Sequence, residues 1–234
     1  MNLLTIFEWL ERLDGWRGFP AVYIVMITAV IVIVAFDWRI SIVALMVQYI
    51  FIGLLLTDLL NPQLAMVKLL AGLFVCLMLY FTGQQANWGK TAPTPSRGQA
   101  VFSKSTQINI GSRIMSLTFP MRVGIVLLSG AVLLAISQLS LFQLPLFTED
   151  MGHLNTAVLL LTLLGLLGIA LSAADPFQAG LGLLMFIAGF ELYYSGIEQT
   201  SATLLMMVTL NFSVTLIISY LTQQHYLQSP MPSG

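Results

Sequence analysis

The stretch FQAGLGLLMFIAGFELYYSGI, residues 177–197, decides the fold class. It is almost entirely apolar or small, yet it contains one carboxyl group, that of Glu191. An apolar run of about 17 to 25 residues is long enough to cross the hydrocarbon core of a bilayer as a helix. The stretch is therefore predicted to span a membrane, and the carboxyl group inside it needs a physical explanation.

The composition of the whole chain supports the same class. Of its 234 residues, 58% are hydrophobic and 8% are charged, whereas about a quarter are charged in a soluble domain. Because a bilayer offers the backbone no water, apolar runs of this length should be helices; a transmembrane barrel would show short alternating segments instead. The prediction is an all-α, polytopic membrane helix bundle of about seven transmembrane helices. They are placed at about 19–36, 40–60, 64–82, 121–143, 152–173, 177–197 and 201–222.

Composition and motifs also exclude several functions. The net charge of −1 argues against a nucleic-acid partner, which requires clustered basic residues. The two histidines, His153 and His225, lie at segment ends, so no buried pair is expected to bind haem or a metal. The sequence has no phosphate-binding loop, nucleophile elbow or paired-histidine zinc motif. We therefore expect no cofactor, and at most a non-catalytic subunit of a membrane enzyme.

The basic residues predict the orientation. Residues 86–120 form a linker with no acidic residue and four basic ones, Lys90, Arg97, Lys104 and Arg113. Such a linker is expected on the cytoplasmic side, and its charge favours contact with anionic lipid. With seven crossings, the N-terminus is then outside and the C-terminus inside, in a membrane that we take to be a bacterial inner membrane.

The remaining segments are assigned from their patterns. Residues 1–18 are predicted to be an interfacial helix, because their leucines share one face and their tryptophans suit the headgroup level. Residues 121–143 form a connecting transmembrane helix, and residues 225–234 form a C-terminal tail. In the linker, the prolines of TAPTPSRGQ, residues 91–99, indicate irregular structure.

Two three-helix repeats, residues 19–85 and 152–224, are predicted on either side of the linker and the connecting helix. Both have an aspartate at their first turn, Asp37 and Asp175, and they end alike, in LYFTGQQ and SYLTQQH. The connecting helix returns the chain across the membrane. Both triplets therefore run in the same direction, as in parallel repeats.

Four polar side chains inside the spans are candidate site residues. Glu191 lies about four residues from the middle of its span, or about 6 Å from the midplane at about 1.5 Å per residue. An ionised carboxylate there costs at least about 2.5 to 3.5 kcal/mol, so it should be neutral, paired or beside water. Lys68 is the only basic residue inside a span, since Arg122 stands at the start of its helix. It falls in the same half of the bilayer, so it could pair with Glu191 directly or through water, or extend its stem to the surface.

Gln48 and Asn211 lie near the middles of their spans. Neutral amides in such places commonly form hydrogen bonds between helices, and a role in a proton relay is the alternative. Glu191 has two corresponding interpretations. It either exchanges protons, as buried ionisable groups in membranes commonly do, or it holds the bundle together through a hydrogen bond.

The second triplet resembles NuoK, the three-helix membrane subunit of respiratory complex I, and its relatives in cation antiporters and energy-converting hydrogenases. The resemblance rests on GFELYYSG, residues 189–196, which matches the glycine-apolar-glutamate motif of the second helix in that family. It implies that Glu191 is the family's intramembrane glutamate, a station in a proton path. Asn211 stands where relatives often have a second glutamate. MVKLLAGLF, around Lys68, is similar to the third-helix pattern of the longer component E subunits of membrane-bound hydrogenases.

The resemblance implies a subunit of a larger proton- or cation-translocating complex, of respiratory or hydrogenase type, with antiporter-like membrane subunits as partners. Glu191 would be the proton station and Lys68 its charge partner, with Gln48 and Asn211 as polar links. Two alternatives remain open. One is a structural or assembly subunit without a transport step, and the other is a stand-alone secondary transporter built from the two repeats.

Overall fold

A computed structural model of the protein describes residues 15, 18–35, 37–85, 107–110, 113–116, 118–138, 151–172 and 175–227. The described helices are α2 (Phe19–Val34), α3 (Trp38–Leu56), α4 (Pro62–Gln85), α5 (Thr118–Gln138), α6 (Gly152–Leu171), α7 (Pro176–Ile197) and α8 (Ser201–Leu227). A short antiparallel hairpin precedes α5. Its strands are β1 (Gln107–Ile110) and β2 (Arg113–Ser116), with Gln107 opposite Ser116 and Ile110 opposite Arg113.

The chain is an integral membrane protein. Five of the described helices, α3, α4, α6, α7 and α8, are long and apolar enough to cross a bilayer. The other two described helices have shorter apolar stretches: α2 has 16 residues, and the apolar stretch of α5 covers Arg122–Ile136. The predicted helix bundle is therefore confirmed, while the count of seven crossings stays a prediction.

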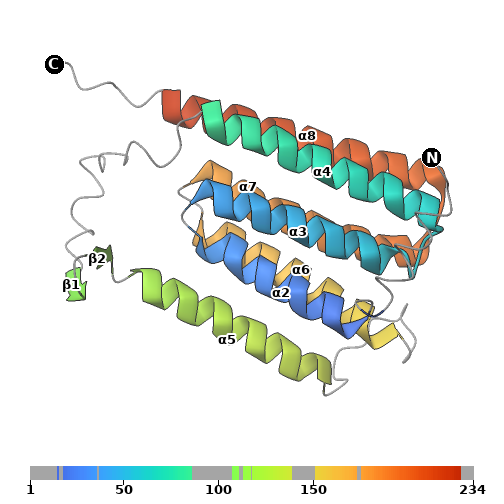
Figure 1. Ribbon diagram of the computed structural model, residues 1–234, viewed down its shortest axis with the longest axis horizontal. Helices are drawn as coiled ribbons and strands as arrows, with labels where there is room; N and C mark the ends of the chain where they lie inside the picture. Colours follow the sequence, from blue (N-terminus) through green and yellow to red (C-terminus); the bar gives the residue numbers. More distant parts are fainter. Residues whose placement is uncertain are drawn as a thin grey trace.

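The described helices other than α5 form two layers, as Figure 1 shows. One layer contains α2, α3 and α4, and the other contains α6, α7 and α8; α2 packs on α6, α3 on α7 and α4 on α8. Helix α5 lies at the edge, against α2 and α6. The α3–α4 and α7–α8 connections share one end of the bundle, called here the α7–α8 end. The α2–α3 and α6–α7 turns share the opposite end, the α6–α7 end (Figure 1).

The two turns at the α6–α7 end are built alike. The carboxylate of Asp37 accepts a hydrogen bond from the backbone N–H of Arg39, and that of Asp175 accepts one from the backbone N–H of Phe177, both at 3.0 Å. Each aspartate thereby caps the N-terminus of the next helix. The matching caps agree with the expected duplication, which stays a prediction.

Glycines allow α6 and α7 to approach very closely. A β-carbon on Gly165 would lie 2.5 Å from the backbone nitrogen of Phe186, and one on Gly182 would lie 2.7 Å from that of Ile169. Small residues of this kind let helix backbones come together in membranes, where packing rather than water exclusion drives association. The α6–α7 pair therefore forms a close-packed support for the polar side chains that α7 carries.

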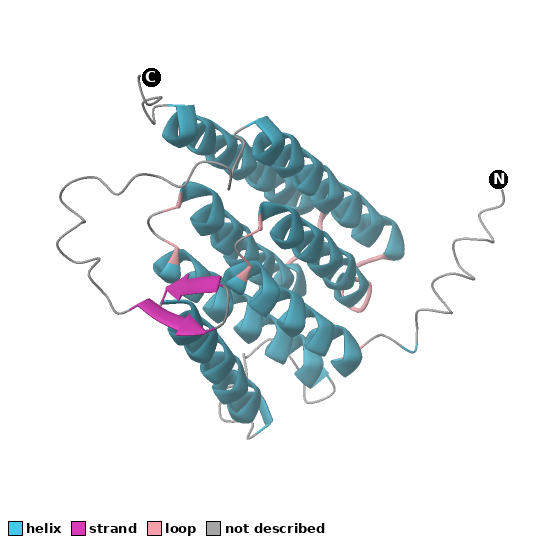
Figure 2. Ribbon diagram, turned by 60° about the vertical axis from the view of Figure 1, so that its left-hand side comes forward, coloured by secondary structure: helices cyan, strands magenta, loops and turns pink. Residues whose placement is uncertain are grey.

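The described chain differs from the predicted segments at two boundaries and in the content of the linker. The linker at 86–120 includes the β1–β2 hairpin, drawn in magenta in Figure 2. Helix α5 begins at Thr118 instead of 121. Helix α8 continues to Leu227, so the first residues of the predicted tail at 225–234 are helical. The irregular stretch at 91–99 and, apart from Gly15 and Gly18, the interfacial helix at 1–18 lie outside the described residues.

Candidate functional site

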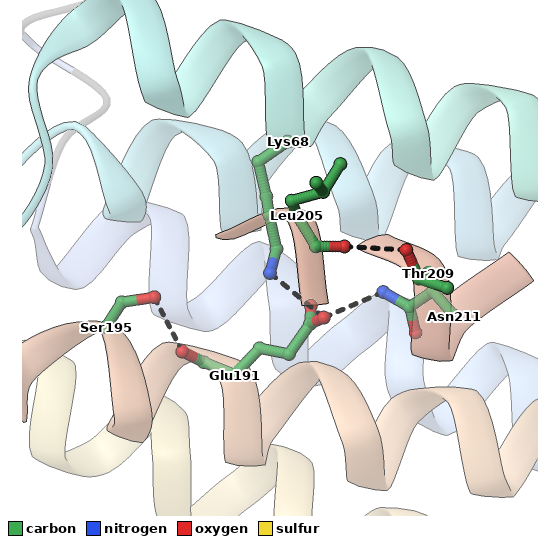
Figure 3. A network of polar contacts seen from close by, with 6 residues as sticks. All are labelled: Lys68, Glu191, Ser195, Leu205, Thr209 and Asn211. Carbon is green, nitrogen blue, oxygen red and sulfur yellow. Dashed lines mark hydrogen bonds and ion pairs between the residues drawn. The ribbon is translucent and has the colours of Figure 1, made fainter. Parts of the chain in front are cut away.

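A buried ion pair joins α4 to α7 between the two layers. The ammonium nitrogen of Lys68 lies 2.9 Å from Oε1 of Glu191 (Figure 3). The side chain of Lys68 is 8% exposed and that of Glu191 is 3% exposed. The two residues that the sequence placed in the same half of the bilayer are thus in direct contact, and the lysine does not extend to the surface. Glu191 is charge-paired, one of the three states expected for a carboxylate at this depth.

Asn211 of α8 is the third member of the cluster. Its amide Nδ2 donates a hydrogen bond of 2.9 Å to the same carboxylate oxygen that contacts Lys68 (Figure 3). Asn211 is 4% exposed, and its amide oxygen has no hydrogen-bond partner among the described residues. Because bonds to an ionised group are about twice as strong as neutral ones, this amide stabilises the charged form of Glu191. Three helices therefore meet at one carboxylate oxygen.

A small cavity adjoins the cluster. It has a volume of about 10 Å³, close to the lower limit for one water molecule. Polar groups on its wall come from Lys68, Glu191, Asn211 and Tyr49 of α3. The Tyr49 ring passes over Gly72 of α4, where an added β-carbon would lie 2.8 Å from the ring. Its hydroxyl group is buried without a hydrogen-bond partner in the described chain.

The sequence did not single out Tyr49. Tyrosine in a span is usually an interfacial residue, but Tyr49 lies near the middle of α3 and is 6% exposed. Buried tyrosine hydroxyls normally find a partner. The central position of this residue, opposite a glycine on the next helix, is the signal that could have identified it.

Gln48 lies outside this cluster. It is 1% exposed, and neither atom of its amide has a hydrogen-bond partner among the described residues. It is not on the wall of the cavity beside Glu191. The structure therefore brings together Glu191, Lys68 and Asn211, but not Gln48, and a role for Gln48 in a relay stays a prediction.

A second polar cluster lies at the α6–α7 end and connects α5 to the rest of the bundle. The guanidinium group of Arg122 donates hydrogen bonds to the Ser172 hydroxyl and, at 3.1 Å, to Oε1 of Gln178. The amide nitrogen of Gln178 in turn donates to the backbone carbonyl of Ala35 at 2.9 Å. These bonds join the start of α5 to both turns at this end. We interpret them as structural, because each of these bonds joins two different helices or turns.

No group of histidine, cysteine, aspartate and glutamate side chains suited to a metal ion occurs in the part of the chain that the structure describes. Comparison of the sequence with protein-family models and with curated proteins, and of the fold with solved structures, finds no match. The NuoK-like resemblance therefore remains a prediction from the quoted motifs.

Proposed function

We propose that the chain is a subunit of a larger proton- or cation-translocating membrane complex, and that Glu191 is a proton station in the ion path. The observation that carries this proposal is the Lys68–Glu191 pair, buried between the layers and 2.9 Å apart. Isolated charges in a membrane are costly and are found mostly in transport, relay or sensor functions. The ammonium group of Lys68 favours the charged form of the carboxylate, and the cavity has room for about one water beside it.

The remaining features of the proposal come from the sequence. Antiporter-like membrane subunits are the expected partners, and the basic linker would contact anionic lipid on the cytoplasmic side of a bacterial inner membrane. The N-terminus would be outside, so that the α7–α8 end faces the outside. Asn211 and Lys68 would set how readily Glu191 exchanges its proton.

The test measures proton translocation by the complex that carries Glu191→Gln. The complex is purified in mild detergent with the subunits that co-migrate and is then reconstituted into liposomes. Glutamine keeps the shape and the hydrogen bond from Asn211 but cannot release a proton. Glu191→Asp is the matched control, because it keeps a carboxylate. We expect translocation to be lost in the glutamine variant and partly kept in the aspartate variant.

Assembly is measured in the same preparations, by the mass of the intact complex in native electrophoresis. Full translocation by Glu191→Gln in a fully assembled complex would overturn the proposal in favour of a structural subunit. Translocation by the purified chain alone would contradict the subunit assignment and indicate a stand-alone transporter.

A further inference from the structure

A second cavity lies between the ion pair and the α7–α8 end. Its volume is also about 10 Å³, and it is formed by α4, α7, α8 and the two connections at that end. Its polar lining side chains, besides Lys68, are Tyr194, Ser195, Glu198, Thr200 and Thr203. We call this cavity the vestibule, and the one beside Glu191 and Tyr49 the inner cavity.

Lys68 lines both cavities. Its ammonium group contacts Glu191, so the same side chain borders the vestibule on one side and the carboxylate on the other. Among the described residues, no other lines both cavities. Because Lys68 borders both cavities, we call it the divider.

The mouth of the vestibule is polar and open to water. Glu198 and Thr200 are exposed. The Thr200 hydroxyl donates to the Glu198 carboxylate at 3.2 Å and lies 2.5 Å from the Thr203 hydroxyl. The Tyr194 hydroxyl donates more weakly to Glu198, at 3.4 Å. This acidic, hydroxyl-lined opening suits water and cations more than apolar molecules.

The face of α7 that bears Glu191 is polar on one side of this residue and apolar on the other. One and two turns toward the α7–α8 end it carries Ser195 and Glu198, which line the vestibule. One and two turns toward the opposite end it carries Ile187 and Leu184, which are apolar and buried. Polar groups on α7 thus connect Glu191 to only one end of the bundle.

On the buried face of α8 that bears Asn211, the next hydroxyl toward the opposite end is that of Thr215. It is completely buried and donates to the backbone carbonyl of Asn211 at 2.7 Å. Its proton is therefore engaged within the helix. The Ser195 hydroxyl is engaged in the same way, with the backbone carbonyl of Glu191 at 2.7 Å (Figure 3). Ser195 is, however, half-buried and borders the vestibule, whereas Thr215 is completely buried. This difference favours access to Glu191 from the α7–α8 end.

We propose that the vestibule is the route by which Glu191 exchanges protons with the aqueous phase at the α7–α8 end, and that Lys68 carries the proton between them. This rests on the proposed function. In the uptake step, Nζ of Lys68 transfers a proton to Oε1 of Glu191, and the neutral amine takes a proton from a hydronium ion in the vestibule, which becomes water. The pair changes from a net charge of zero to +1, and release is the reverse.

The route is tested by cysteine labelling in proteoliposomes, in a Cys76→Ala background that removes the buried native thiol. The probe is a cationic, membrane-impermeant methanethiosulfonate reagent added to one face at a time. Thr203→Cys lies in the vestibule, and Met206→Cys lies one turn along α8 on its exposed apolar side. We expect Thr203→Cys to be labelled only from the face that holds the α7–α8 end, and Met206→Cys, in lipid, to remain unlabelled from both.

The divider is tested with Ile52→Cys, which places a thiol on the wall of the inner cavity. With Lys68 present, we expect slow labelling of Ile52→Cys. With Lys68→Ala, we expect the labelling rate to rise by about ten-fold or more. A ten-fold rise corresponds to about 1.4 kcal/mol in the free energy of opening the inner cavity to the vestibule. If Lys68→Ala does not fold, Lys68→Ala combined with Glu191→Gln removes both charges and serves the same purpose. An unchanged rate in whichever of these folds contradicts the divider.

These outcomes are independent of translocation. If Thr203→Cys is not labelled, or is labelled from both faces, the vestibule is not the proton route. The proposed function of Glu191 is not affected by that result. Normal translocation by Glu191→Gln overturns the proposed function whatever the labelling shows.

Discussion

The contribution of the Lys68–Glu191 pair to the free energy of unfolding can be predicted from its burial and geometry. The two groups are 2.9 Å apart and less than a tenth exposed. Removing one member of such a pair leaves an uncompensated buried charge and typically costs about 3 to 5 kcal/mol, whereas replacing both members is often close to neutral. Lys68→Met and Glu191→Gln should therefore each destabilise the fold by about 3 kcal/mol or more, and the double variant should lie within about 1 kcal/mol of the wild type.

The assay is equilibrium unfolding in mixed micelles, followed by helical circular dichroism. Arg39→Met is the control, because Arg39 is exposed at the start of α3 and surface substitutions usually change stability by no more than about 0.5 kcal/mol. The comparison is a double-mutant cycle, in which residues in contact show a coupling energy and independent residues do not. If the cost of the double variant equals the sum of the single costs, the two side chains are not coupled, and the reasoning from the ion pair is refuted.

Three further outcomes test the fold. Gly182→Ala should destabilise the protein by about 1 to 3 kcal/mol, because the added β-carbon meets the backbone of α6. Gly124 has open space around it, so Gly124→Ala should be neutral or stabilising by up to about 1 kcal/mol. Equal shifts in melting temperature for the two variants would contradict the close packing of α6 on α7. Arg122→Met should weaken the packing of α5 on the bundle by about 1.5 to 3 kcal/mol. The expected readout is faster amide hydrogen exchange in α5 but not in α7. Unchanged exchange in α5 would contradict the role of Arg122 in holding this helix. Asp37→Ala and Asp175→Ala should each cost about 1 kcal/mol in unfolding measurements, and a silent substitution at either turn would show that its cap does not stabilise the helix.

Much of the fold was predictable because membrane helices follow from local composition. The predicted span at 177–197 corresponds to α7 (Pro176–Ile197), since an apolar run bounded by a proline and a polar turn leaves the backbone few alternatives. The β1–β2 hairpin was missed. Its signal was the dipeptide Gly111–Ser112 between two short alternating stretches, a pairing typical of tight hairpins that the nearby prolines obscured.

The site was predictable only in part. Depth along each helix follows from sequence, so Lys68 and Glu191 could be placed at matching levels. Which side chains face each other depends on how the helices are rotated about their axes, and packing between distant segments decides this. The contact of Asn211 with Glu191, the isolation of Gln48 and the position of Tyr49 over Gly72 all depend on that rotation. The two cavities depend on it as well.

The central claim is that Glu191, though buried beside Lys68, can gain and lose a proton. Infrared difference spectroscopy of the purified protein, recorded between acidic and alkaline buffers, measures this directly through the carbonyl stretch of a protonated carboxylic acid. The account predicts a band from a carboxyl group in apolar surroundings that titrates in the wild type and is missing in Glu191→Gln. A difference spectrum that is the same in the wild type and in Glu191→Gln would contradict it.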